Sequence, residues 1–144
     1  MDALTATLFV HAAATLAMGG AIWFVQIVHY PMMALVPADA FERYERVHRQ
    51  RTTFVVGPLM LAEAASAALL AWLCPPETRW LGWLGIALLA AIWASTFGVQ
   101  VPLHARLERG FDARIHRRLV ATNWGRTGLW TARAGLSLWL LGAA

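Results

Sequence analysis

Residues 122–133, TNWGRTGLWTAR, open the last apolar segment of the chain. Helical periodicity puts Asn123, Arg126, Trp130 and Arg133 on one face, while small and apolar residues occupy the opposite face. Arg133 then lies about 15 Å along the helix axis from Asn123, close to the midplane of a bilayer core about 30 Å thick. A guanidinium at that depth is costly unless it faces inward and meets a partner. The rest of the fold must therefore supply a partner for Arg133.

The composition is that of an integral membrane protein. The chain has 144 residues, of which 59% are hydrophobic and 14% are charged, whereas soluble domains carry about 25% charged residues. Its mean hydropathy is +0.53. The length fits one domain of four membrane spans, which we predict at about residues 4–30, 52–73, 80–103 and 123–143. It leaves no room for a separate soluble catalytic domain.

The positive charge is explained by topology. All 12 basic residues are arginines, and the net charge is +4. Because they flank apolar spans, we interpret them as topology signals and exclude nucleic-acid binding. The single cysteine, Cys74, excludes an internal disulfide and a multi-cysteine metal cage.

The arginines also predict the orientation of the spans. Four lie in residues 31–51 and six in residues 104–126, against one in the turn near Pro75 and none at either terminus. The positive-inside rule puts both rich connections on the cytoplasmic side of the inner membrane and both termini outside. We therefore predict an all-α, antiparallel four-helix bundle embedded in the bilayer.

Each arginine-rich connection contains an amphipathic pattern. In Ala38–Gln50, Phe41, Tyr44 and His48 share one face, and the charged residues around them, Glu45 included, are expected on a solvated face. In residues 104–122 apolar residues repeat every four positions, with an interruption near Gly110 and with Asp112 as a helix cap. We predict two surface helices on the cytoplasmic side, with His116 facing solvent or lipid headgroups.

Glu63 is the only carboxylate within the predicted spans. It lies about 16 Å from the start of its span, which is nearly the depth of Arg133. We therefore predict an ion pair between the two side chains within the membrane. Such a pair either contributes catalytic residues to a functional site, which is the role we predict for Glu63 and Arg133, or only fixes the register of the helices.

Polar stripes on several helices predict a shared cavity in the cytoplasmic half. His29, Gln100, His104 and Asn123 are expected to line it. Three further side chains lie at the same level, namely Gln26, Trp124 and Arg126. The surface helix adds His48. Deeper in the first span, His11 is expected to be a core histidine bonded to a neighbouring helix.

The histidines do not have metal-ligand spacing within any one helix. A metal site would need His29, His48, His104 and Glu63 to converge from separate elements, and we expect no metal. The sequence assigns no cofactor. The eight tryptophans suit anchoring at the membrane interface, and they also suit stacking on a flat aromatic ligand.

Three short motifs resemble a known family. VPLHARL at residues 101–107, NWGRTGLWTAR at residues 123–133 and His29-Tyr30-Pro31 are similar to motifs of small four-span membrane proteins that include the anthrone-oxygenase-like proteins of polyketide pathways. His104 stands where that family usually has asparagine. The resemblance implies that molecular oxygen reacts with a carbanion formed on a bound aromatic substrate.

Two functions of different classes follow. The first is a membrane-embedded oxidoreductase or oxygenase-like protein that binds a lipid-soluble aromatic or quinone-like ligand. Arg126 and Arg133 would hold an enolate or phenolate oxygen, and His29 or His104 would be the base. The remaining polar side chains would orient or stack on the ligand, namely Gln26, His48, Gln100, Asn123, Trp124 and Trp130.

The second function is non-enzymatic. The protein would be a membrane subunit, an assembly factor or a small transporter, and the Glu63–Arg133 pair would fix helix packing. The lipid bilayer is a partner in either case, and the sequence leaves self-association open.

Overall fold

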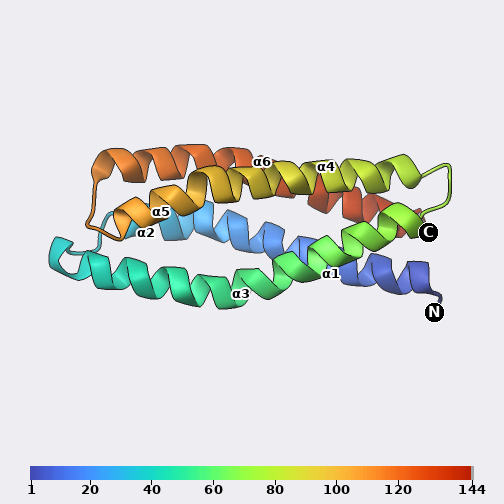
Figure 1. Cartoon of the computed structure of the whole chain (residues 1–144), viewed down its shortest axis with the longest axis horizontal. Helices are drawn as coiled ribbons and strands as arrows, with labels where there is room; N and C mark the ends of the chain where they lie inside the picture. Colours follow the sequence, from blue (N-terminus) through green and yellow to red (C-terminus); the bar gives the residue numbers. More distant parts are fainter. Residues whose placement is uncertain (144) are drawn as a thin grey trace.

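The computed structural model describes residues 1–143, which form helices and short connections with no strand. Four long helical segments lie side by side (Figure 1). The first is α1 (Ala3–Phe24) continued by η1 (Val25–His29) and α2 (Tyr30–Met33), and the second is α3 (Ala38–Leu73). The third is α4 (Arg79–Ser95) continued by η2 (Thr96–Gln100) and α5 (Val101–Leu107), and the fourth is α6 (Ala113–Gly142). The all-α class predicted from the sequence is confirmed.

Three of the four segments are long and apolar enough to cross a membrane. They are Ala3–Met33, Ala38–Leu73 and Arg79–Leu107, with mean hydropathies of 1.7, 1.8 and 1.8. The fourth segment, α6, is not among them, and it carries five of the arginines. These lengths and compositions are those of a membrane protein.

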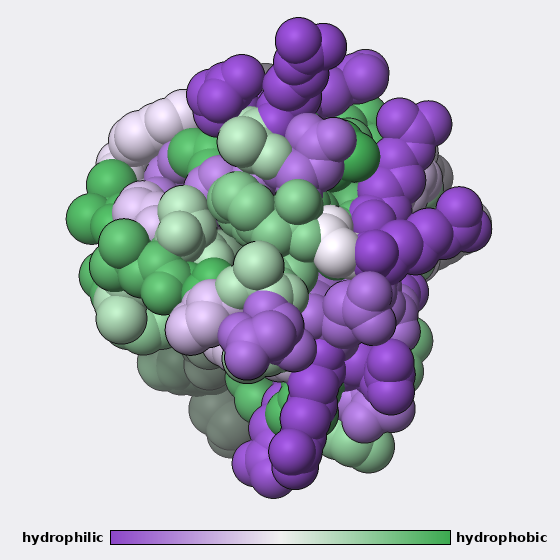
Figure 2. Space-filling model, turned by 90° about the vertical axis from the view of Figure 1, so that its left-hand side faces the viewer, coloured by the Kyte–Doolittle hydropathy of each residue, from purple (hydrophilic) through white to green (hydrophobic). Residues whose placement is uncertain are grey.

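The two ends of the molecule differ in composition. Both termini lie at one end, and the connections at residues 34–37 and 108–112 lie at the other (Figure 1). We call the latter the arginine-rich end, and its arginines are Arg43, Arg46, Arg49, Arg51, Arg106, Arg109, Arg114, Arg117 and Arg118. Figure 2 shows hydrophilic side chains gathered on this end beside an apolar area.

The predicted surface helix at Ala38–Gln50 is not a separate element. These residues form the first third of α3, which runs for 36 residues to Leu73. No helix breaker separates the two parts, and the Thr53 hydroxyl donates to the Arg49 carbonyl across the expected boundary at 2.8 Å. The apolar face packs inside the molecule, since Phe41 is fully buried against Tyr30 and Leu103.

The second arginine-rich connection is likewise divided between two long segments. The chain leaves α5 at Leu107, turns at Gly110 with φ of 130°, and enters α6 at Ala113. The Asp112 side chain accepts hydrogen bonds from the backbone N–H groups of Arg114 and Ile115, at 2.7 and 3.1 Å. The interruption near Gly110 and the Asp112 cap are therefore confirmed. The residues predicted to form a separate surface helix belong instead to the end of α5 and the start of α6.

Two short π-helical segments, η1 and η2, each end just before a proline. Pro31 and Pro102 both follow the end of a π segment by two residues. A π turn admits an extra residue and widens the helix, which accommodates a proline ring inside a continuous helix. For this reason the helix continues through Pro31 to Met33, whereas the first span was predicted to end at about residue 30.

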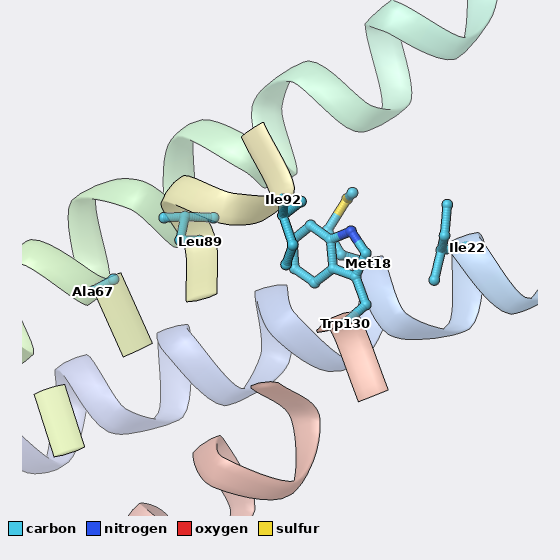
Figure 3. Packing of buried hydrophobic residues seen from close by; sticks show 6 residues of the cluster. All are labelled: Met18, Ile22, Ala67, Leu89, Ile92 and Trp130. Carbon is cyan, nitrogen blue, oxygen red and sulfur yellow. The ribbon is translucent and has the colours of Figure 1, made fainter. Parts of the chain in front are cut away.

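The core consists of three apolar clusters along the bundle. The middle cluster surrounds Trp130, a fully buried side chain that Met18, Ile22, Leu89 and Ile92 enclose (Figure 3). One cluster lies toward the arginine-rich end and another toward the termini. The polar side chains described below lie between and beside these clusters.

Candidate functional site

A chain of hydrogen bonds joins three helical elements near the arginine-rich end. Glu45 of α3 approaches His104 of α5, with Oε1 and Nδ1 2.5 Å apart. The Nε2 atom of His104 lies 3.0 Å from the hydroxyl of Tyr30, the first residue of α2. Glu45 is fully buried. This arrangement lets His104 donate from Nδ1 to the carboxylate and accept a hydrogen bond from Tyr30 at Nε2.

A cavity of about 370 Å³ lies beside this chain, between all four helical segments. Its polar wall contains Tyr30, His48, Gln100, His104 and Arg126. Its apolar wall is formed by small and aliphatic side chains from α1 and α3, including Met18, Ala21, Ile22, Val56 and Met60. The cavity thus has one end for a polar group and one for an apolar body.

Two arginines line the cavity, Arg49 and Arg126, and Arg49 is paired with Glu108. The exposed fraction of Arg126 is only 8%. The Nη1 atom donates to the Asn123 side-chain oxygen at 3.1 Å, whereas Nε has no hydrogen-bond partner among residues 1–143. No carboxylate of that part of the chain forms an ion pair with it. A buried guanidinium in this state favours an anionic or strongly polarised oxygen in the cavity.

A second layer of amides holds Arg126 from behind. Asn123 donates to the Gln26 side-chain oxygen at 2.8 Å, and Gln26 in turn donates to the Val120 carbonyl at 3.4 Å. Gln26 and Asn123 are both buried, and neither lines the cavity. They position the arginine and do not contact the space where a ligand would lie.

The three predicted histidines of the site fall into two groups. His104 and His48 line the cavity, and their ring centroids are 5.5 Å apart. His29 stacks on the other side of His48, at a centroid distance of 4.2 Å, and lines a separate surface hollow with Tyr44. The structure therefore places His29 behind His48, next to the cavity wall, and its predicted role in the site stays a prediction.

Other predicted site residues also lie off the cavity. Gln100 lines it as predicted, and its amide donates to the Thr122 hydroxyl at 2.9 Å. Asn123 does not line it, because it lies behind Arg126 and accepts a hydrogen bond from that side chain. Trp124 is half exposed on the outer surface beside Trp23, and Trp130 is enclosed in the middle core cluster. The structure therefore does not bring these two tryptophans to the cavity wall.

The predicted ion pair between Glu63 and Arg133 is present and fully buried. Arg133 donates to Glu63 Oε1 from Nε at 3.0 Å and from Nη2 at 2.8 Å. The Thr15 hydroxyl donates to the same oxygen at 2.6 Å, and Arg133 Nη1 donates to the Gly85 carbonyl. The pair therefore ties α1, α3, α4 and α6 together. Neither residue lines the cavity.

Two other histidines have structural partners. His11 lies 3.0 Å from the Ser66 hydroxyl on α3, which confirms it as a core histidine bonded to a neighbouring helix. His116 was expected to face solvent or headgroups, but it is buried and lies 2.8 Å from the Tyr30 carbonyl. Because α6 already begins at Ala113, His116 faces the bundle and fixes the backbone that carries Tyr30.

Glu45 and Tyr30 are the site residues that sequence analysis missed. Glu45 was assigned to a solvated face because the helix that carries it was expected to end near Gln50. A helical periodicity extended through that position would have found it, because Phe41, Glu45, His48 and Thr52 follow one another on one stripe. Tyr30 had no such signal beyond its place before Pro31.

Ion pairs close the arginine-rich side of the site. Arg46 and Arg49 of α3 both pair with Glu108, which follows α5. These pairs join the same two segments as the Glu45–His104 contact. Among residues 1–143, no three His, Cys, Asp or Glu side chains form a group that could hold a metal ion.

No protein-family model, curated protein or solved structure matches this chain. The resemblance to anthrone-oxygenase-like proteins therefore stays a prediction from short motifs. The function has to be argued from the cavity and its polar wall.

Proposed function

We propose that the protein crosses the inner membrane four times as an antiparallel bundle, with the arginine-rich end in the cytoplasm and both termini outside. Three segments have the length and hydropathy for this, and the arginines of both long connections gather at one end. In α6, Arg126 and Arg133 are buried within the bundle. A membrane-impermeant maleimide should label Arg43→Cys and Arg109→Cys only from the cytoplasmic face, and labelling of the two from opposite faces would refute the topology.

Within this frame we propose that the cavity binds a lipid-soluble aromatic or quinone-like compound with an acidic hydroxyl, enol or activated C–H group. The observation that carries the proposal is Arg126, a buried cation without a carboxylate partner in residues 1–143 that lines the same cavity as Tyr30 and His104. A guanidinium beside a base is the minimum set for removing a proton and holding the resulting oxyanion.

The hydrogen-bonded chain gives each residue a role in proton transfer. Glu45 holds the proton of His104 on Nδ1, so Nε2 is the basic atom. The Tyr30 hydroxyl, 3.0 Å from Nε2, passes a ligand proton to His104 or gives one back. Arg126 stabilises the negative charge that stays on the ligand oxygen. Glu63 and Arg133 take no part in these steps.

For an anthrone the proposed reaction is an oxidation by molecular oxygen. Loss of a methylene proton gives a carbanion whose charge is delocalised onto the carbonyl oxygen near Arg126. The carbanion forms a C–O bond to dioxygen, and protonation gives a hydroperoxide. Loss of the second methylene proton with cleavage of the O–O bond then forms the new carbonyl and releases the outer oxygen as water. The motif resemblance favours this substrate class, and the cavity supports its first step.

Calorimetric binding of a lipid-soluble phenol such as para-ethylphenol tests the ligand site. Arg126→Gln should weaken binding about 10- to 100-fold, because a charge-assisted hydrogen bond is lost. Arg106→Gln removes the same charge from an exposed position away from the cavity and should change little. Equal effects of the two changes would exclude the cavity as the binding site.

Oxygen uptake with anthrone as the substrate tests the chemistry. Glu45→Gln should abolish uptake while para-ethylphenol still binds, because the glutamine no longer fixes the proton of His104 on Nδ1. Uptake unchanged by Glu45→Gln would contradict the proton-transfer role. The absorption spectrum and metal content of the purified protein would show whether haem, flavin or metal takes part.

The Glu63–Arg133 geometry favours a second, structural role for that pair. Its atoms bond to each other, to Thr15 and to the Gly85 backbone. We propose that it fixes the register of the four segments and that the catalytic role predicted for Glu63 and Arg133 does not apply. If fixing the helix packing were the only role of the buried polar residues, the protein would be a non-enzymatic subunit, assembly factor or transporter. That alternative does not explain the cavity beside Arg126.

A further inference from the structure

Two buried indole N–H groups near the apolar end of the cavity have no hydrogen-bond partner. They belong to Trp130 of α6 and Trp93 of α4, and neither finds an acceptor among residues 1–143. Tryptophan only donates, and buried N–H groups in native proteins are almost always paired. Two unpaired donors in one region therefore need an explanation.

The Trp130 nitrogen lies on the cavity side of its ring. Figure 3 shows the nitrogen edge of the indole turned toward Met18 and Ile22 and away from Leu89 and Ala67. Met18 and Ile22 both pack against Trp130 and both line the cavity. The donor is thus separated from the cavity by these two flexible side chains.

Trp93 lies in the same region on α4, the segment that packs beside α6. It packs against the cluster around Trp130, and its ring meets Phe97 edge to face at a centroid distance of 5.9 Å. Phe97 lines the cavity, as does Thr96 on the same stripe. The two indoles therefore lie in one cluster of which two other members, Met18 and Ile22, line the deep end of the cavity.

The spacing along α6 relates this region to the polar wall. Trp130 follows Arg126 by four residues, which is one helical turn or about 6 Å along the axis, on the same face of α6. One aromatic ring with an oxygen at each of two opposite positions covers about that distance. A ligand oxygen at Arg126 and a second near Trp130 fit one planar molecule.

We propose that Trp130 and Trp93 form a second polar subsite, which takes a carbonyl oxygen at the end of the ligand opposite its acidic group. The proposal rests on the function proposed above, and it narrows the ligand class. The preferred compounds are planar aromatics with an acidic hydroxyl at one end and a carbonyl at the other, as in hydroxyaryl ketones. Met18 and Ile22 change rotamer to expose the Trp130 donor when such a ligand binds.

Two probes of nearly equal shape test the subsite. In para-hydroxyacetophenone a carbonyl lies opposite the hydroxyl, and in para-ethylphenol a methylene group takes its place. The parent protein should bind the ketone about 3- to 10-fold more tightly, the value of one neutral hydrogen bond. Trp130→Phe keeps an aromatic ring and removes the N–H, so the preference for the ketone should fall by about this factor while para-ethylphenol affinity stays within about twofold.

Trp139→Phe is the matched control, since that indole is exposed on the outer surface, and it should keep the preference. Trp93→Phe provides a second test if Trp130→Phe fails to fold, and it should at least reduce the preference. Equal binding of the two probes by the parent, or a preference that both cavity-side changes leave undiminished, would overturn the subsite. Failure of the parent to bind either probe would overturn the proposed function and the subsite with it.

Discussion

Arg133 and Arg126 are both buried guanidiniums on α6, about two helical turns apart, but only Arg133 has a carboxylate within reach. Arg133 uses Nε and both terminal nitrogens, two for Glu63 and one for the Gly85 carbonyl. Arg126 donates to Asn123, lies beside the Tyr30 hydroxyl, and lines a cavity. A buried arginine thus stabilises the packing where the protein itself supplies its hydrogen-bond partners. Where the protein leaves some of its N–H groups unpaired, the arginine can bind a ligand.

The surroundings of the two arginines explain this division. The Glu63–Arg133 pair lies where four segments meet closely, and even a Cβ at Gly85 would be in van der Waals contact with the guanidinium, at 3.7 Å. Near Arg126 the segments separate around a cavity whose wall includes Gly57, where a Cβ would meet nothing. Close packing supplies partners for a charge, and separation of the helices leaves space for a molecule.

The largest expected effect comes from breaking the packed pair. Arg133→Met leaves the Glu63 carboxylate buried without its cation and should lower the free energy of unfolding by about 3–5 kcal/mol. Denaturation in detergent or bicelles would measure the loss. A variant as stable as the parent would mean that Arg133 is not a structural partner of Glu63.

The double change Glu63→Gln/Arg133→Met separates the pair from the site. It removes both charges, so its cost should be less than the sum of the two single changes. If the pair is structural, the double variant should keep the affinity for para-ethylphenol. A folded double variant that no longer binds this phenol would give the pair a role in the site after all.

A smaller effect on stability, with a larger one on binding, is expected at Arg126. Arg126→Met strands no carboxylate, and it removes a desolvated charge that the protein only partly satisfies. The free energy of unfolding should change by less than about 1 kcal/mol or rise, since structure at binding sites is often kept at the expense of stability. A loss comparable to that of Arg133→Met would break the comparison and make Arg126 a packing residue.

The contrast also marks what the sequence can predict. The Glu63–Arg133 pair follows from counting residues inward from the arginine-rich ends of two spans. The count does not depend on how the connections between the spans fold. The cavity needed more. Whether Ala38–Gln50 lies on a membrane or continues α3 cannot be decided from periodicity, because one amphipathic pattern suits both a bilayer surface and the α2 and α5 helices on which it packs. Glu45 was therefore missed.

The π segments account for another difference from the sequence prediction. His29 ends η1, and an extra residue in one turn rotates the following side chains by about 100° relative to a regular helix. Tyr30 thereby takes the place on the cavity that the α-helical count gave to His29. No residue pattern in η1 announced the π turn, although the proline that follows it is a common companion of irregular helix geometry.

The smallest effect belongs to a carboxylate outside the bundle core. Asp112 caps α6, and the backbone N–H groups of Ile115 and Arg114 are the main cause that lowers its pKa below 3.8, with Arg114 and Arg117 adding to it. A lowered pKa contributes stability that is fully present above 3.8 and is lost as the pH falls through the pKa of the folded state. Asp112→Asn keeps a capping side chain without the charge. In thermal melts the parent should therefore be slightly more stable than this variant near neutral pH, and the difference should vanish in acid. A stability difference that does not depend on pH would mean that Asp112 stabilises α6 through hydrogen-bond geometry and that its charge contributes nothing. A difference as large as that of Arg133→Met would contradict the expectation that buried charges contribute more to stability than exposed ones.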